Sequence, residues 1–85
     1  MTNKDSYREL IDDIDQQIIE LIGERNDTVT ALHLYKRSIN DPLWDQQRVD
    51  EVIDVYVESL GQIDGIRIAT AIIGTQEQLE QLADE

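Results

Sequence analysis

The sequence predicts an all-α protein of three helices, one long and two short, that forms an intertwined homodimer. The 85-residue chain has 40% hydrophobic residues but no Phe and only one Trp, so Ile, Val, Leu and Ala must build its core. Apolar residues recur at helical spacing in three segments, which the turn signals "INDP" and "GQIDG" separate. The composition and length indicate a single domain over residues 1–85.

The first helix is expected to run from about residue 7 to about residue 38. "SYRE" reads as a capping box in which Ser6 is the N-cap and Glu9 follows three residues later. Gly23 is a single internal glycine, which costs a helix about 1 kcal/mol and does not stop it. The first proline is Pro42, so the apolar stripe that begins at Leu10 continues without interruption almost to that point.

Two shorter helices follow. Asp45 is the expected N-cap of the second, an amphipathic segment of about fifteen residues that ends at Gly61. Asp64 is the expected N-cap of the third. The β-branched residues of "IRIATAII" would also allow a strand, but no second segment could pair with it, so a helix is favoured.

The length of the first helix predicts the dimer. At 1.5 Å per residue it would extend for ~48 Å, whereas a small domain is roughly 30 Å across. Two short helices cannot cover the whole apolar stripe, so a second copy of the chain must cover its far end, with the long helices paired. The alternative is a monomer in which the first helix breaks at Gly23 and folds into a four-helix bundle.

Composition excludes several classes of function. The chain has no Cys and only His33 as a possible imidazole ligand, so we expect no thiolate chemistry, no metal site and no cofactor. A formal net charge of −12 disfavours nucleic-acid binding. Neither a signal peptide nor an apolar run of the ~18 residues that a membrane span needs is apparent, which predicts a cytoplasmic protein.

Two cations interrupt the apolar stripe. On a helical wheel with Ile18 at the origin, Arg25 falls at about −20° and Lys36 at about 0°, where an unpaired charge is costly. Arg48 would join them if the second helix packs on the second half of the first. Such convergence in an acidic protein predicts a small anionic ligand, with ion pairs to a facing helix or solvent exposure of the cations as alternatives.

The segments "YRELIDDIDQQIIELIGER", "LYK" and "PLWDQQR" resemble the all-helical chorismate mutases. The resemblance extends over nearly the whole chain and rests on a multi-point pattern of charged residues: Arg8, Asp15, Arg25, Lys36, Asp45 and Arg48. It implies an intertwined helical dimer with two active sites that rearrange chorismate to prephenate. It also implies no cofactor and no nucleophile, because the reaction is pericyclic.

The resemblance further implies the roles of individual residues. Arg8 looks like the arginine that the partner contributes, and Arg25 and Arg48 would hold the substrate carboxylates with it. Lys36 would reach the ether oxygen and a carboxylate, and Asp45 would help to bind the ring hydroxyl. The family's ether-oxygen glutamine aligns with Glu80, with Gln76 one turn earlier and Gln81 adjacent as the competing registers.

The chain departs from the family at Val49, where a Glu usually binds the ring hydroxyl. Isochorismate pyruvate lyases of the same fold also tend to have Arg-Val there, but they usually lack the acid at Asp45. A lyase, an aminodeoxychorismate mutase and a non-catalytic helical interaction module therefore stay as alternatives to chorismate mutase. The short "ESLGQIDGIRIATAII" resembles the intracellular subclass that DAHP synthase activates, which implies DAHP synthase as a partner.

Overall fold

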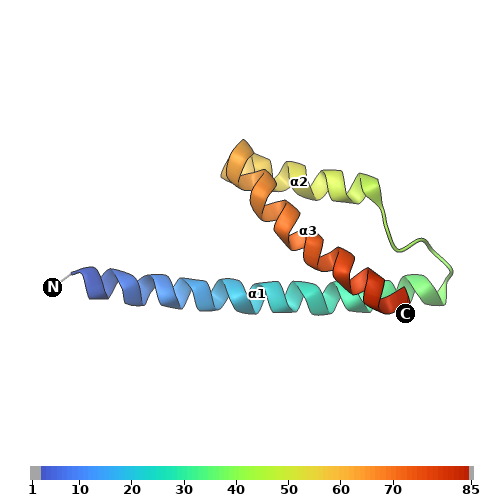
Figure 1. Ribbon diagram of the computed structural model, residues 1–85, viewed down its shortest axis with the longest axis horizontal. Helices are drawn as coiled ribbons and strands as arrows, with labels where there is room; N and C mark the ends of the chain where they lie inside the picture. Colours follow the sequence, from blue (N-terminus) through green and yellow to red (C-terminus); the bar gives the residue numbers. More distant parts are fainter. Residues whose placement is uncertain (1–2, 85) are drawn as a thin grey trace.

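The chain folds into three helices and no strand within the residues that the structure describes. The computed structural model describes the backbone of residues 3–84 and the side chains of residues 3–74. Its helices are α1 (Lys4–Ser38), α2 (Gln46–Leu60) and α3 (Gln62–Asp84). Figure 1 shows α1 as one long rod, with α2 above it and α3 crossing from α2 to the C-terminal half of α1. The predicted all-α class, with one long helix and two shorter ones, is confirmed.

α1 begins earlier than predicted and is not broken. Asn3 is its N-cap, and the Asn3 side chain accepts a hydrogen bond of 2.9 Å from the backbone N–H of Ser6. The prediction that Ser6 caps the helix is therefore wrong, because Asn caps at least as well as Ser and Asp5 adds a favourable charge to the first turn. The helix continues through Gly23, which rules out the four-helix alternative.

α2 begins and ends where the sequence predicted. Asp45 is its N-cap, and a carboxylate oxygen of Asp45 accepts a hydrogen bond of 3.1 Å from the backbone N–H of Arg48. Gly61 ends the helix with φ of 90°, a backbone conformation that side chains with a Cβ rarely adopt. This cap holds the backbone of Arg48 in the first turn of the helix.

α3 is a helix, and the alternative strand over residues 66–73 is wrong. The helix begins at Gln62, so Asp64 lies in its first turn and the prediction that Asp64 is the N-cap is also wrong. The reason is that the turn is shorter than expected: the Gly61 carbonyl already accepts a hydrogen bond of 2.8 Å from the Gly65 N–H. One residue therefore separates α2 from α3.

The core lies between α2 and α3. Its buried residues are Val49, Ala69 and Ile73, and partly buried side chains pack around them: Trp44, Val52, Ile53 and Tyr56. α3 also packs against α1, whereas no Cα atom of α1 comes within 8 Å of one in α2. The expectation that the second helix packs directly on the first is therefore wrong, because α2 packs on α3 and α3 in turn packs on α1.

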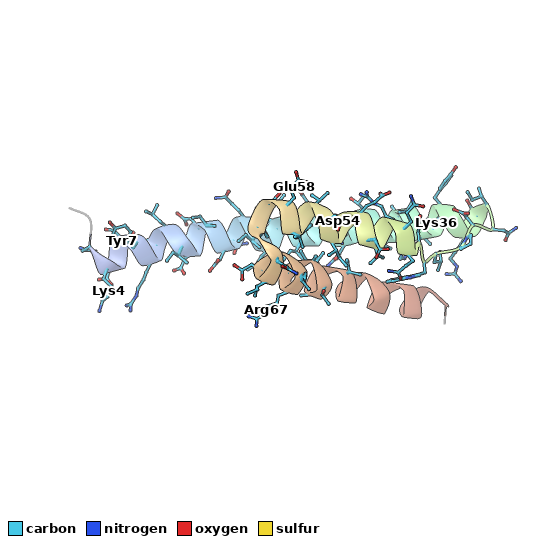
Figure 2. All side chains as sticks on the ribbon, turned by 90° about the horizontal axis from the view of Figure 1, so that it is seen from above. Lys4, Tyr7, Lys36, Asp54, Glu58 and Arg67 are labelled. Atoms are coloured by element: carbon cyan, nitrogen blue, oxygen red, sulfur yellow. The ribbon has the colours of Figure 1, made fainter. Side chains whose placement is uncertain are left out.

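The N-terminal half of α1 has no covering element (Figure 2). Leu10, Ile11, Ile14 and Ile18 are 48–57% exposed. The radius of gyration is 16.4 Å, against about 12 Å for a compact domain of this length. The accessible surface is 6787 Å², against about 5,200 Å² for a compact monomer of this mass. A single chain therefore exposes an apolar stripe that its own helices do not bury.

None of the described helices has the length and apolar composition that crossing a bilayer requires.

Candidate functional site

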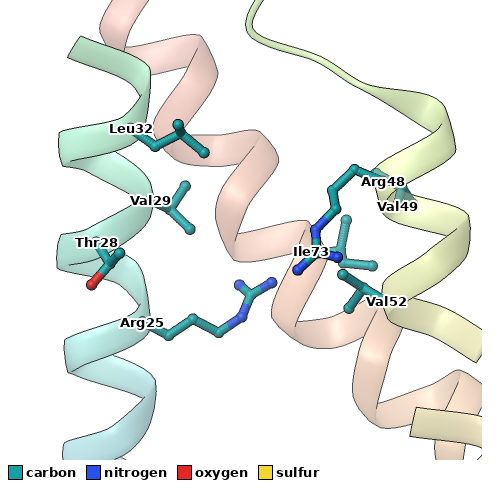
Figure 3. A pocket seen from close by; sticks show the side chains of 8 residues that line it. All are labelled: Arg25, Thr28, Val29, Leu32, Arg48, Val49, Val52 and Ile73. Atoms are coloured by element: carbon teal, nitrogen blue, oxygen red, sulfur yellow. The ribbon is translucent and has the colours of Figure 1, made fainter. Parts of the chain in front are cut away.

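A cavity of about 390 Å³ separates α1 from α2 (Figure 3). Its volume lies in the range of small-molecule sites. α3 closes one side of it. The cavity is lined by Arg25, Thr28, Val29 and Leu32 from α1, by Arg48, Val49 and Val52 from α2, and by Ile73 from α3. The helical spacing of the α1 residues places all four on the side that faces α2.

Arg25 extends from α1 into this cavity (Figure 3). Its Nη1 atom is buried and makes no hydrogen bond. Among the side chains of residues 3–74, no carboxylate forms an ion pair with it. Leaving a buried cationic donor without a partner is costly, so the arrangement calls for an anionic ligand at this point. The alternative that Arg25 pairs with an acid of a facing helix has no support within this part of the chain.

Arg48 reaches into the same cavity from α2, and its guanidinium points toward that of Arg25 (Figure 3). One nitrogen, Nη1, lies 3.3 Å from Oε2 of Glu51, and the Arg48 side chain is 67% exposed. An exposed ion pair between residues one turn apart contributes at most about 1 kcal/mol, so a ligand can replace it at little cost. The two guanidinium groups together can hold two carboxylates.

Apart from Thr28, the remaining walls are apolar. Val29, Leu32, Val52 and Ile73 surround the two arginines, and Val49 is a buried part of the wall with 9% exposure. No carboxylate belongs to the described lining, and no group of metal-ligating side chains gathers among the described residues. The cavity therefore suits a compact dianion that has an apolar body.

Residues 7–73 match the protein family described as chorismate mutase type II. The chain belongs to this family. The match spans α1, α2 and the part of α3 that carries Ile73. No curated protein matches the chain, and no solved structure matches it either. Enzymes of this family are isomerases with chorismate as the substrate, so the resemblance found in the sequence is confirmed.

Two of the residues predicted for the chorismate mutase site lie beside the cavity rather than in its lining. Lys36 donates a hydrogen bond of 3.2 Å from Nζ to the backbone carbonyl of Leu43, in the connection between α1 and α2. The carboxylate of Asp45 is engaged in the cap of α2. Both residues are thus held at the end of the cavity where this connection runs, and their predicted substrate contacts stay predictions.

Arg8 is far from the cavity of its own chain. It precedes Arg25 by 17 residues, which is about 25 Å along the helix axis. Its Nη1 atom lies 4.0 Å from Oδ1 of Asp5, and both side chains are exposed. Arg8 therefore cannot serve the site of the same chain. Gln76, Glu80 and Gln81 lie outside the residues whose side chains the structure describes, so the residue at the ether oxygen also stays a prediction.

Six of the eight cavity residues were not among the predicted site residues: Thr28, Val29, Leu32, Val49, Val52 and Ile73. Thr28 lies one turn from Arg25 and could have been found from helical spacing alone. Val52 and Ile73 could not, because their place depends on how α2 and α3 pack. No local sequence signal distinguishes an apolar residue that lines a site from one that fills a core.

Proposed function

We propose that the chain rearranges chorismate to prephenate in the cavity between α1 and α2, with Arg25 and Arg48 binding the two carboxylates of the substrate. The observation that carries this proposal is the buried Nη1 of Arg25, which has no hydrogen-bond partner and faces Arg48 across a cavity whose other walls are mostly apolar. Two fork-shaped guanidinium groups suit two planar carboxylates, since each can donate two parallel hydrogen bonds.

The reaction requires that the substrate be bound in one reactive conformation, and it requires little else of the protein. In chorismate one C–O bond breaks while a C–C bond forms within the same molecule, and no proton is transferred. The rate gain comes from holding the compact conformer and from positive charge at the ether oxygen, where electron density grows. The apolar walls strengthen that electrostatic effect because they surround the bound substrate with a medium of lower dielectric constant than water.

Lys36 is the proposed source of that positive charge. Its Nζ now bonds the Leu43 carbonyl at 3.2 Å. A flexible ammonium group can exchange this acceptor for the ether oxygen and a carboxylate of the substrate. Asp45 is proposed to bind the ring hydroxyl, and Glu80, or else Gln76 or Gln81, to lie at the ether oxygen.

The site is proposed to be completed by a second copy of the chain, which supplies Arg8. The accessible surface exceeds that of a compact monomer by about 1,600 Å², whereas a standard interface buries about 800 Å² per partner. A homodimer in which the N-terminal half of α1 enters the other subunit would bury this excess. It would also carry the partner's Arg8 toward Arg25.

Mixing two inactive variants tests the shared site. Arg8→Ala and Arg25→Ala should each be nearly inactive alone, because each homodimer lacks one arginine in both sites. After the two are mixed and exchange subunits, half of the dimers have one intact site, so about a quarter of wild-type activity should return. Chorismate consumption measured before and after exchange checks this. If exchange is demonstrated and no activity returns, Arg8 and Arg25 do not come from different chains.

Val49 gives a specific reason to test a second candidate, a related lyase or aminodeoxychorismate mutase. Its buried side chain offers the cavity only methyl groups, so nothing at that position accepts a hydrogen bond from a ring hydroxyl. Incubation with chorismate, isochorismate and aminodeoxychorismate, followed by identification of products, should give prephenate as the fastest product. Faster release of pyruvate from isochorismate would favour the lyase instead.

DAHP synthase is a proposed partner, with the segment over residues 38–45 as the responsive element. This segment carries both the Leu43 carbonyl that accepts a hydrogen bond from Lys36 and the Asp45 cap that holds the backbone of Arg48. Saturating cognate DAHP synthase should therefore raise kcat/KM for chorismate. Unchanged kinetics would remove this partner and leave the mutase proposal intact.

A further inference from the structure

Arg67 lies in an apolar groove that the proposed chemistry does not use. The groove has a volume of about 640 Å³ and runs between α1, on the N-terminal side of the cavity, and the end of the molecule where α2 and α3 meet. Its α1 wall is formed by Ile18, Leu21, Ile22 and Arg25. Apart from Arg25 and Arg67, every residue that lines it is apolar or aromatic. Figure 2 shows Arg67 at that end.

Arg67 has no ion-pair partner among the residues whose side chains are described. The nearest acid along its own helix is Asp64, three residues earlier, and the two are not within 4 Å. A cation at the rim of an apolar groove becomes desolvated when the groove is filled, so whatever fills it must bring an acid to this point.

Asp15 lies in α1 outside the cavity, so the proposed chemistry does not explain why an acid stands there. It lies about 60° from the centre of the apolar stripe, closer than any other acid of residues 9–20. The positions three and four residues away hold only Ile and Asp, so no cation of its own helix can pair with it. It is exposed in the single chain.

The occupant that fits the groove is the N-terminal half of α1 from a second copy. That segment has the uncovered apolar stripe, and residues 9–20 contain five acids and no cation, which complements the two arginines of the groove. If the partner's Arg8 lies level with Arg25, antiparallel α1 helices bring Asp15 of the partner subunit level with Ile18. Ile18 is in the stretch of α1 that faces the groove with Arg67.

We propose that Arg67 forms an ion pair with Asp15 of the partner subunit and that this pair fixes the register in which the partner's Arg8 is delivered to the cavity. The inference rests on the proposed shared-site mutase. Ile and Leu side chains alone fix register weakly, because a shift of one turn keeps apolar residues opposite apolar residues. A charged pair penalises such a shift, since both charges would then be buried without partners.

A charge-swap series tests the pair. Arg67→Asp and Asp15→Arg should each raise the dimer dissociation constant about tenfold or more, because each places like charges opposite one another. The double variant restores opposite charges and should return the constant to within a few-fold of wild type. Arg37→Asp is the matched control, because it makes the same change in net charge at an exposed position outside the cavity and the groove. Sedimentation equilibrium measures the constants, and circular dichroism reports helix content.

The possible outcomes distinguish three hypotheses: the ion pair, the dimer and the proposed mutase activity. The ion pair is overturned if the double variant dimerises no more tightly than the weaker single variant. It is also overturned if Arg67→Asp raises the dissociation constant no more than Arg37→Asp does. Arg67→Gln should weaken the dimer less than Arg67→Asp. It replaces Arg67→Asp in the test if that charge reversal prevents folding. A monomeric wild type overturns the pair and the shared site together. A wild-type dimer that does not convert chorismate refutes only the proposed function, and the dissociation constants still decide the pair.

Discussion

Replacing Arg25 with Ala should lower kcat/KM for chorismate by about a thousandfold or more, because it removes a preorganised double donor from the binding site of a dianion. The same change should leave the free energy of unfolding unchanged or slightly higher. The Arg25 Nη1 is buried without a partner, so its removal leaves no described acid stranded and relieves a desolvated charge. Steady-state kinetics and urea unfolding at one protein concentration measure both effects.

Two control variants test whether the loss of activity comes from the hydrogen-bond donors of Arg25 or from the loss of a positive charge alone. Arg25→Lys keeps the charge but loses the fork of donors, so its activity should lie between those of wild type and Arg25→Ala. Arg37→Ala removes an exposed cation outside the cavity and should leave kinetics unchanged. If Arg25→Ala instead destabilised the protein by the 3–5 kcal/mol or so that a broken buried ion pair costs, Arg25 would be a structural residue.

Gly65→Ala should destabilise the protein by about 3 kcal/mol or more, the largest stability effect expected of any glycine here. A Cβ at Gly65 would lie 2.5 Å from Cα and 2.7 Å from N of Val57, and 2.8 Å from the carbonyl oxygen of Tyr56. These are backbone atoms, so α2 and α3 would have to move apart where Gly65 meets Val57. Because α3 also holds Ile73 at the cavity, activity should fall with stability.

Gly23→Ala is the matched control, since Gly23 is also inside a helix but nothing lies within 4 Å of the added Cβ. It should raise the free energy of unfolding by about 0.5–1 kcal/mol through helix propensity and the reduced entropy of the unfolded chain. Urea unfolding of both variants at equal protein concentration measures the difference. Equal effects at Gly65 and Gly23 would mean that the close approach of α2 and α3 is not required.

The local features of the fold could be predicted from the sequence because they depend on neighbouring residues. The cap at Asp45, the helix end at Gly61 and the helical periodicity each involve residues within one turn of each other. The same periodicity placed Arg25 within the apolar stripe of α1, and Arg25 does line the cavity together with Val29 and Leu32 of the same helix. The charged pattern that continues to Arg48 identified the chorismate mutase family before any fold was known.

Competition between nearly equal local signals limited that prediction. Asn3 and Ser6 are both good caps three residues apart, and the earlier one was chosen because it adds a turn to α1 without any loss. The start of α3 was missed for a related reason. Gly61 both ends α2 and accepts the first hydrogen bond of α3, so no separate capping residue was needed.

By itself, the sequence determined the three helices, the cations within an apolar stripe and the family. Only the tertiary structure decided that α3 packs against both α1 and α2, that Ile73 and Val49 wall the cavity, and that Arg25 has no partner among the described side chains. The physical reason is the distance along the chain between the interacting residues. Caps and periodicity depend on residues within one or two turns, whereas the cavity forms where segments more than twenty residues apart meet. Shape also matters at shorter range, because the missing side chain of Gly65 lets α3 lie directly against the backbone of Val57 in α2.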